Sequence, residues 1–238
     1  MEPITDQNPD LLRMQQEYAR RTEEGLAGDR YSFQNPAHRW IILDRHKEIR
    51  KLLKTHQPAG LADLQILEIG CGSGGVMDEF IQLGEEPGTL VGVDLLLDRL
   101  KQASTSMKNE CSWVNANGQH LPFLDETFNL TLQFTAFSSI LDPETKKEMA
   151  AEILRVLKPG GSIVWYDFIW NPANPQTKGI GLKEIKRLFP GCNLTPARIT
   201  LAPPLVRVLL PRFPRLADWL ASLKILNSHL LVWIQKPG

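Results

Sequence analysis

The segment at residues 67–75 (LEIGCGSGG) constrains this chain most, because four glycines and an acid stand where an apolar run ends. The apolar run at 64–69 predicts a buried parallel strand, and 76–83 predicts the helix that follows it. Glycine permits positive φ angles and lets a ligand approach the main chain without meeting a Cβ atom. Because the helix N-terminus offers free N–H groups and partial positive charge, we predict a turn that receives a nucleoside ligand.

Two cofactor patterns share these glycines. Gly70, Gly72 and Gly75 fit the G-x-G-x-x-G dinucleotide pattern, whereas Glu68, Gly70, Gly72 and Gly74 fit the E-x-G-x-G-x-G pattern of S-adenosylmethionine (SAM) sites. The turn by itself therefore leaves both cofactors open.

The next predicted strand, at 89–94, ends in Asp94, about twenty residues beyond the glycines. A carboxylate at this place suits the ribose hydroxyls of either cofactor. As an alternative, Asp94 caps the helix predicted at 96–107. Asp94 therefore supports an adenosine ligand without choosing between the two cofactors.

Three later segments decide between them: 117–123 (NGQHLPF), a strand near 129–134, and the turn at 154–161 (LRVLKPGG) that leads into a strand at 162–168. With the glycine turn, this series resembles the class I SAM-dependent methyltransferases of the small-molecule type, over roughly residues 60–168. The resemblance implies an α/β fold with a doubly wound, mostly parallel seven-stranded sheet whose last strand is antiparallel. It also implies SAM as cofactor and S-adenosyl-L-homocysteine as product.

The resemblance assigns roles to individual residues. Glu68 orients the glycine loop or meets the methionine ammonium group, Asp94 binds the ribose, Asn117 the adenine amino group, and the Gly118 N–H a ring nitrogen. The family usually has an acid where this chain has Asn117, whose amide oxygen can still accept a hydrogen bond. The expected cofactor-binding residues are Glu68, Gly70, Cys71, Gly72, Gly74, Asp94, Leu95, Asn117, Gly118 and Phe134.

Candidates for chemistry beyond the cofactor are fewer. A hydroxyl acceptor needs a base, and the expected ones are Asp167, His38 and Tyr166, with His120 as a further candidate and no family motif behind any of them. Tyr31 and Phe137 are the expected substrate contacts. The sequence contains no metal-ligand cluster, so we expect no metal.

The domain organisation follows from the same pattern. We expect an N-terminal helical cap at 1–60 and a SAM-binding core at 61–238, with lids in the cap and in an insertion at about 169–226. Within that insertion, 203–226 is rich in leucine and arginine. It is interpreted as a lid or dimer contact, with a peripheral membrane contact or a cover for a lipid-like acceptor as the alternative.

Composition restricts the partners. The chain has 27 basic and 27 acidic residues, so it lacks the positive excess typical of nucleic-acid binding, and we expect no nucleic-acid partner. Its three cysteines have no metal or disulfide spacing. No apolar stretch approaches the length of a membrane span, and the N-terminus lacks a signal sequence, so we expect a cytoplasmic protein.

The expected function is methyl transfer from SAM to an oxygen or nitrogen nucleophile of a small molecule. The phrase at 188–205 resembles bacterial methyltransferases of glycan and natural-product pathways, which favours a small acceptor. One alternative is an NAD(P)-dependent oxidoreductase, although no Tyr-x-x-x-Lys spacing is present. The other is a SAM-binding protein without catalytic activity.

Overall fold

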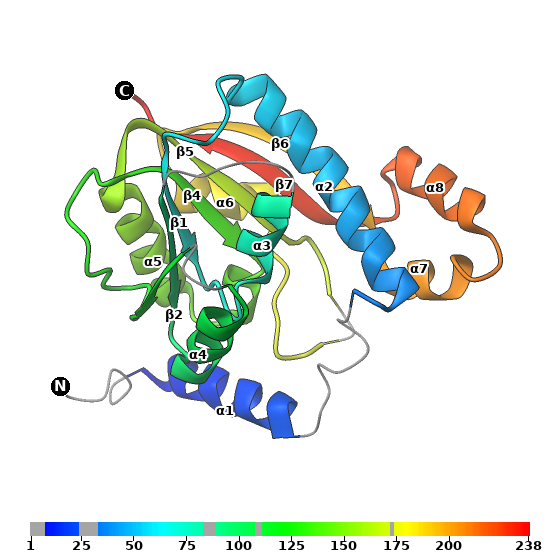
Figure 1. Cartoon of the computed structure of the whole chain (residues 1–238), viewed down its shortest axis with the longest axis horizontal. Helices are drawn as coiled ribbons and strands as arrows, with labels where there is room; N and C mark the ends of the chain where they lie inside the picture. Colours follow the sequence, from blue (N-terminus) through cyan, green and yellow to red (C-terminus); the bar gives the residue numbers. More distant parts are fainter. Residues whose placement is uncertain (1–7, 24–32, 83–88, 108–110, 172–173) are drawn as a thin grey trace.

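A computed structural model describes residues 8–23, 33–82, 89–107, 111–171 and 174–238 (Figure 1). Its centre is a seven-stranded sheet with the order β3-β2-β1-β4-β5-β7-β6. β7 is antiparallel to both of its neighbours, and the other paired strands run parallel. The strands are β1 (Gln65–Ile69), β2 (Thr89–Asp94), β3 (Ser112–Asn115), β4 (Phe128–Phe134), β5 (Leu157–Phe168), β6 (Asn193–Leu201) and β7 (Asn227–Gln235).

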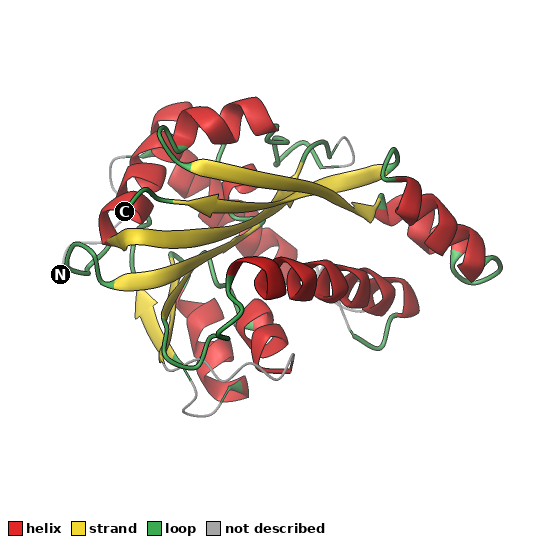
Figure 2. Ribbon diagram, turned by 90° about the horizontal axis from the view of Figure 1, so that it is seen from above, coloured by secondary structure: helices red, strands yellow, loops and turns green. Residues whose placement is uncertain are grey.

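Helices cover both faces of the sheet (Figures 1 and 2). Side chains alternate along β1, so that Leu67 packs into one apolar cluster with α5 and α6, while Ile66 packs into a second cluster with α2 and α3. The helices are α1 (Pro9–Glu23), α2 (Pro36–His56), α3 (Gly75–Gln82), α4 (Leu97–Ser106), η2 (Phe137–Ser139), α5 (Pro143–Val156), α6 (Leu182–Leu188), α7 (Pro203–Leu209) and α8 (Pro214–Leu223).

Helix α1 is held at the end of the sheet where the parallel strands have their carboxyl ends. Both carboxylate oxygens of Asp10 are engaged: one accepts from Arg13 and the other from the backbone N–H groups of Leu141 and Asp142, at 2.7 and 3.0 Å. Met14 packs on the apolar cluster of the α5 face. This anchoring places α1 across the carboxyl ends of the parallel strands.

The predicted fold is confirmed, including the antiparallel last strand. The predicted strand at 89–94 coincides with β2. Two elements differ from expectation. β3 is a four-residue strand that periodicity did not reveal, and β5 begins at Leu157, so that the Pro-Gly-Gly turn belongs to the strand. In the described part of the chain, no helix combines the length and apolar character needed to cross a membrane.

Candidate functional site

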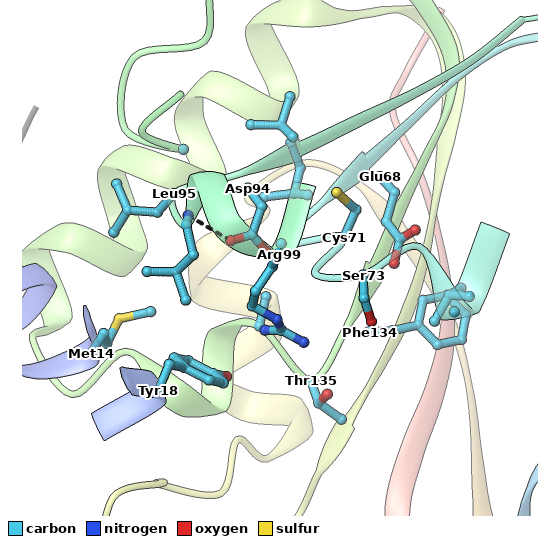
Figure 3. Close-up of a pocket in the computed structure, with 18 of the residues that line it drawn as sticks. Met14, Tyr18, Glu68, Cys71, Ser73, Asp94, Leu95, Arg99, Phe134 and Thr135 are labelled. Carbon is cyan, nitrogen blue, oxygen red and sulfur yellow. Dashed lines mark hydrogen bonds between the residues drawn. The ribbon is translucent and has the colours of Figure 1, made fainter. Parts of the chain in front are cut away.

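A cavity of about 380 Å³ lies at the carboxyl ends of β1, β2 and β4. The loops after these strands line it together with residues of α1 and α2, and Figure 3 shows Met14 and Tyr18 of α1 at one side of the cavity. Its lining residues are Leu11, Met14, Tyr18, His38, Ile42, Arg45, Glu68, Ile69, Gly70, Cys71, Ser73, Gly75, Val76, Glu79, Val93, Asp94, Leu95, Leu96, Arg99, Ala116, Asn117, Gly118, Phe134, Thr135, Ala136, Ile140, Thr145 and Met149.

The glycine loop needs its glycines for two reasons. Gly70 has φ +69°, and a Cβ atom there would stand 2.7 Å from the Cβ of Ala136. Gly72 has φ +56°, and its face is covered by the Arg99 guanidinium. Gly74, with φ +82°, faces Met107 and Trp113. Gly70 therefore lines the cavity itself, whereas Gly72 and Gly74 are outside the lining set and shape the loop from behind.

Asp94 connects the glycine loop to the second strand. Its Oδ2 accepts from the Gly72 N–H at 2.8 Å, and its Oδ1 accepts from the Leu96 N–H at 2.8 Å. Leu96 is the N-cap residue of α4, and no described side chain caps this helix, so Asp94 holds the turn before α4 without capping it. A carboxylate oxygen can accept more than one hydrogen bond, so Asp94 keeps acceptor capacity toward the cavity.

Glu68 is an acid without a full set of partners. Its side chain is 1% exposed, and its Oε2 has no hydrogen-bond partner among the described residues. Burial, together with Glu79 and Asp94, raises the pKa of Glu68 well above its usual value. A cationic ligand in the cavity would compensate the charge of this carboxylate. The free Oε2 is an acceptor that fits the ammonium group of an amino acid.

The segment predicted to contact adenine follows β3. The Asn117 Oδ1 accepts from the Gln119 N–H at 3.0 Å, and its Nδ2 donates to the Gln119 Oε1 at 3.2 Å. Gly118 lines the cavity, and a Cβ atom there would stand 2.9 Å from the Met149 sulfur. The amide is thus held in one orientation, and the space that a side chain at position 118 would need is filled by Met149.

The opposite wall contains a buried ion pair. Arg45 of α2 binds Glu79 of α3, and its guanidinium lies 5.5 Å from the centre of the Phe134 ring. Burial opposes ionisation of Glu79, but Arg45 and His46 outweigh it and hold the pKa of Glu79 below its usual value. Glu79 is therefore a counter-ion for Arg45 and a poor proton acceptor.

His38 is the one predicted base that lines the cavity. Burial, reinforced by the charge of Arg45, lowers the pKa of His38 below its usual value of 6.5. The imidazole is consequently neutral at pH 7 and able to accept a proton. Cys71 also lines the cavity, but burial raises the pKa of its thiol, so it is protonated and a poor nucleophile.

Of the other residues predicted to act as a base or to contact substrate, Tyr166 and Phe137 do not line the cavity, and Tyr31 is not described. Tyr166 is outside the lining set: its hydroxyl is 3.0 Å from that of Thr200, its ring stacks on His229, and burial raises its pKa to about 12. Phe137 is fully buried against Trp165, with ring centres 4.7 Å apart. Tyr31 lies outside the described residues.

Asp167 is likewise outside the cavity lining and fully buried. Its carboxylate accepts from the Gln133 side chain and the Ser138 N–H, each at 3.0 Å, and from the Phe168 N–H at 2.8 Å. Burial raises the pKa of Asp167, although these donors oppose the rise. Asp167 therefore holds the turn after β4 and is not placed to act as a base.

We expect Asp167→Ala to destabilise the fold rather than remove chemistry directly. Three donors would lose their acceptor, at about 1–3 kcal/mol for a buried group left unsatisfied. Thermal denaturation should show a lower midpoint than for the control Asp98→Ala, whose side chain is exposed. An unchanged midpoint would contradict the structural role.

The sequence predicts a lid or a dimer contact for segment 203–226. None of its residues lines the cavity, so the cavity gives no support to the lid interpretation. The helices that close the site are α1 and α2, from the N-terminal region. Leu11, Met14 and Tyr18 of α1 face the cavity, and the Arg99 guanidinium lies 5.0 Å from the centre of the Tyr18 ring (Figure 3).

The sequence reasoning missed Arg45 and Arg99. A signal for Arg45 was available, because it stands between Ile42 and Ile49 on the face of α2 that is buried. A cation at an apolar helix position needs a specific partner. Arg99 carried no comparable signal, since its place beside Gly72 depends on how α4 packs.

Comparison with known proteins agrees with this geometry. Residues 66–161 match the family model described as a methyltransferase domain. Over 112 residues, covering 45% of this chain and 32% of the relative, the chain is 36% identical to the sterol 4-C-methyltransferase of Caenorhabditis elegans. Over 133 residues, covering 52% of this chain and 53% of the relative, it is 33% identical to the demethylmenaquinone methyltransferase of Lactiplantibacillus plantarum. The chain thus spans about a third to a half of these two relatives.

Solved structures show the same fold. An S-adenosylmethionine-dependent methyltransferase from Mesorhizobium loti superimposes with a TM-score of 0.56 at 16% identity, over 78% of this chain and 96% of that one. The strand order and the helices on both faces of the sheet define an α/β fold with a cavity at the carboxyl ends of its parallel strands. Residues 66–161 thus match a methyltransferase domain, and the chain shares its fold with a solved SAM-dependent methyltransferase.

The remaining candidates for metal or disulfide chemistry are the acidic, histidine and cysteine side chains. The described residues contain no group of three or more His, Cys, Asp or Glu side chains that could hold a metal ion. Cys71, Cys111 and Cys192 are free.

Proposed function

We propose that this protein transfers a methyl group from SAM to a small, largely apolar acceptor. The observation that carries the proposal is one cavity lined both by Glu68, Asp94 and Asn117, the expected cofactor residues, and by His38 and Ile42 of α2. One wall is suited to adenosylmethionine and the other to an acceptor. Such a juxtaposition provides the proximity on which methyl transfer depends.

The cofactor residues divide into three groups. Glu68 would hold the ammonium group, Asp94 the ribose, and Asn117 with Gly118 the adenine, while Gly70, Cys71, Leu95 and Phe134 would supply contact surface. Gly72 and Gly74 would act through the loop conformation. When bound, SAM supplies an electrophilic methyl group on a sulfonium ion.

The acceptor wall favours apolar molecules. Leu11, Met14, Ile42, Phe134 and Ile140 are among the residues that line the cavity. Two relatives are named for a sterol and for demethylmenaquinone, which are lipophilic acceptors. Their reactions include carbon methylation, so carbon nucleophiles belong in the acceptor panel beside the oxygen and nitrogen nucleophiles that the sequence predicts.

Titration of the protein with SAM and separately with NADH tests the cofactor assignment. We expect binding of SAM alone. Formation of S-adenosylhomocysteine with a panel of quinols, phenols, sterols and amines then tests activity. Absence of SAM binding would overturn the proposal, and SAM binding without product across the panel would favour a non-catalytic SAM-binding protein.

We further propose His38 as the base for an acceptor that must lose a proton. His38→Gln should lower kcat with a hydroxyl acceptor by roughly 10²–10⁴-fold while leaving SAM affinity nearly unchanged. Because the pKa of His38 is lowered, the wild-type rate should fall only at pH values below the usual 6.5 and be flat above it. This inflection should vanish in the variant.

His120→Gln is the matched control, since His120 is exposed and outside the cavity. Equal losses in the two histidine variants would show that the effect is not specific to the cavity. A pH profile of His38→Gln identical to that of the wild type would remove His38 from the base role.

A further inference from the structure

The two helices between β6 and β7 carry an exposed surface that combines apolar and basic side chains. The apolar members include Val208, Phe213, Trp219 and Ile225, which are exposed by 71, 58, 56 and 70%. We call this the α7–α8 surface, and its basic members are Arg207, Arg212, Arg215 and Lys224. Monomeric proteins rarely expose large aromatic and aliphatic groups together unless the surface has a partner.

The exposed stripe is distinct from the face that packs on the body. On α8, Leu216, Trp219 and Leu223 are exposed and recur at helical spacing. On the inward side, Ala217 is buried in a small cluster with Leu201 and Val206. The outward leucines and tryptophan are therefore not needed to attach α8 to the protein.

The charge of this surface has one sign. Segment 203–226 has four basic residues and a single acid, Asp218, in a chain that is neutral overall. Asp218 accepts a hydrogen bond from the Trp40 Nε1 of α2 at 3.0 Å, and this bond ties α8 to α2. None of the four cations forms an ion pair with another residue in the described part of the chain. The outward face is consequently apolar and positive.

The helices project from one end of the sheet, beside the N-terminal half of α2 (Figures 1 and 2). α2 is also the helix that carries His38 and Ile42 into the cavity. The charge of Arg207 is felt by His38, where it contributes to the lowered pKa. The surface thus lies on the side of the molecule where α2 enters the site.

We propose that the α7–α8 surface binds the headgroup region of an anionic lipid bilayer. Apolar side chains of such an element enter the interface, while arginine and lysine pair with lipid phosphates. Tryptophan suits this boundary because its ring is apolar and its N–H is polar. A second copy of the chain is disfavoured as the partner, because a two-fold contact would bring the same four cations face to face.

Vesicle sedimentation tests the proposal with the full chain. Wild-type protein should sediment with vesicles of phosphatidylcholine and phosphatidylglycerol and much less with phosphatidylcholine alone. Arg212→Glu/Arg215→Glu should weaken binding by about tenfold or more, since each basic residue near an anionic surface contributes on the order of a tenfold factor or somewhat less. The control Lys183→Glu/Lys186→Glu makes the same charge change on α6, which packs on the opposite face of the sheet, and should bind like the wild type.

A second variant, Phe213→Ser/Trp219→Ser, separates insertion of apolar groups from simple charge attraction. It should also bind anionic vesicles less tightly, with unchanged circular dichroism because both side chains are exposed. No sedimentation of the wild type with anionic vesicles overturns the proposal. So does dissociation of a wild-type dimer by this variant in sedimentation velocity, because the surface would then be a contact between copies. Neither readout depends on methyl transfer.

Discussion

Glu68→Gln is expected to weaken SAM binding and, at neutral pH, to stabilise the ligand-free protein. The buried carboxylate has one oxygen without a partner, and its ionisation is opposed by burial and by Glu79 and Asp94. The ammonium group of SAM would supply the missing countercharge. Loss of a hydrogen bond between charged groups costs about 1.5–3 kcal/mol, which corresponds to roughly a 10- to 150-fold loss of affinity.

The gain in stability follows from proton linkage. The pKa of Glu68 in the folded protein is well above the usual 4.5, so the folded state binds the proton more tightly than the unfolded state. The resulting stabilisation is complete below the unfolded pKa and is lost as the pH rises through the folded pKa. Glutamine resembles the protonated acid at every pH and removes this loss.

Two measurements check the prediction. Denaturation from pH 4.5 upward should show a smaller decline in stability for Glu68→Gln than for the wild type. Calorimetric titration in buffers with different ionisation enthalpies should show proton release on SAM binding by the wild type, wherever the free carboxyl is protonated, and none by the variant. Glu144→Gln changes an exposed acid and serves as the control. Unchanged SAM affinity in Glu68→Gln would remove Glu68 from the ammonium role.

Asp94→Ala is expected to damage both the cofactor site and the loop that forms it. The Gly72 and Leu96 N–H groups would lose their acceptor, and the ribose hydroxyls would lose theirs. Loss of the ribose contact alone should weaken SAM binding by about 1.5–3 kcal/mol, the range for a charged hydrogen bond. Release of the glycine loop should lower the melting temperature as well.

Asp94→Asn separates the two effects. Asparagine keeps one oxygen, so it can retain a backbone acceptor bond while losing the negative charge that favours ribose hydroxyls. We expect its melting temperature to lie between those of wild type and Asp94→Ala, with SAM affinity still reduced. Asp98→Ala, an exposed acid in the first turn of α4, is the control. Wild-type SAM affinity in a folded Asp94→Ala protein would exclude the ribose role.

The cofactor wall could be predicted from the sequence because its information is local. The backbone of the glycine loop requires positive φ at Gly70, Gly72 and Gly74, and only a few residues separate each strand end from its ligand-facing group. Strands that run parallel bring their carboxyl ends to one edge, so Glu68, Asp94 and Asn117 converge whatever the details of packing.

The direction of the Asp167 side chain near the end of β5 could not be predicted from the sequence in this way. Asp167 lies near the carboxyl end of β5 as Asp94 lies at the end of β2, and on sequence pattern alone both are expected at the cavity. In the structure, Asp167 turns beneath the loop after β4, where Ser138 and Gln133 donate to it. The direction of the side chain depends on contacts between segments about thirty residues apart, and periodicity contains no information about them.

By itself, the sequence determined the α/β fold and SAM as the cofactor, and it named most of the residues after strand ends that line the cavity, because these depend on strand ends and glycine conformations fixed within short segments. Only the tertiary structure decided that α1 and α2 close the site, that His38 and Arg45 enter it, and that Asp167, Tyr166 and Phe137 do not. It also decided that residues 203–226 turn outward. These outcomes depend on which side chains pack between distant elements, and long-range packing selects among arrangements that the same local pattern permits equally.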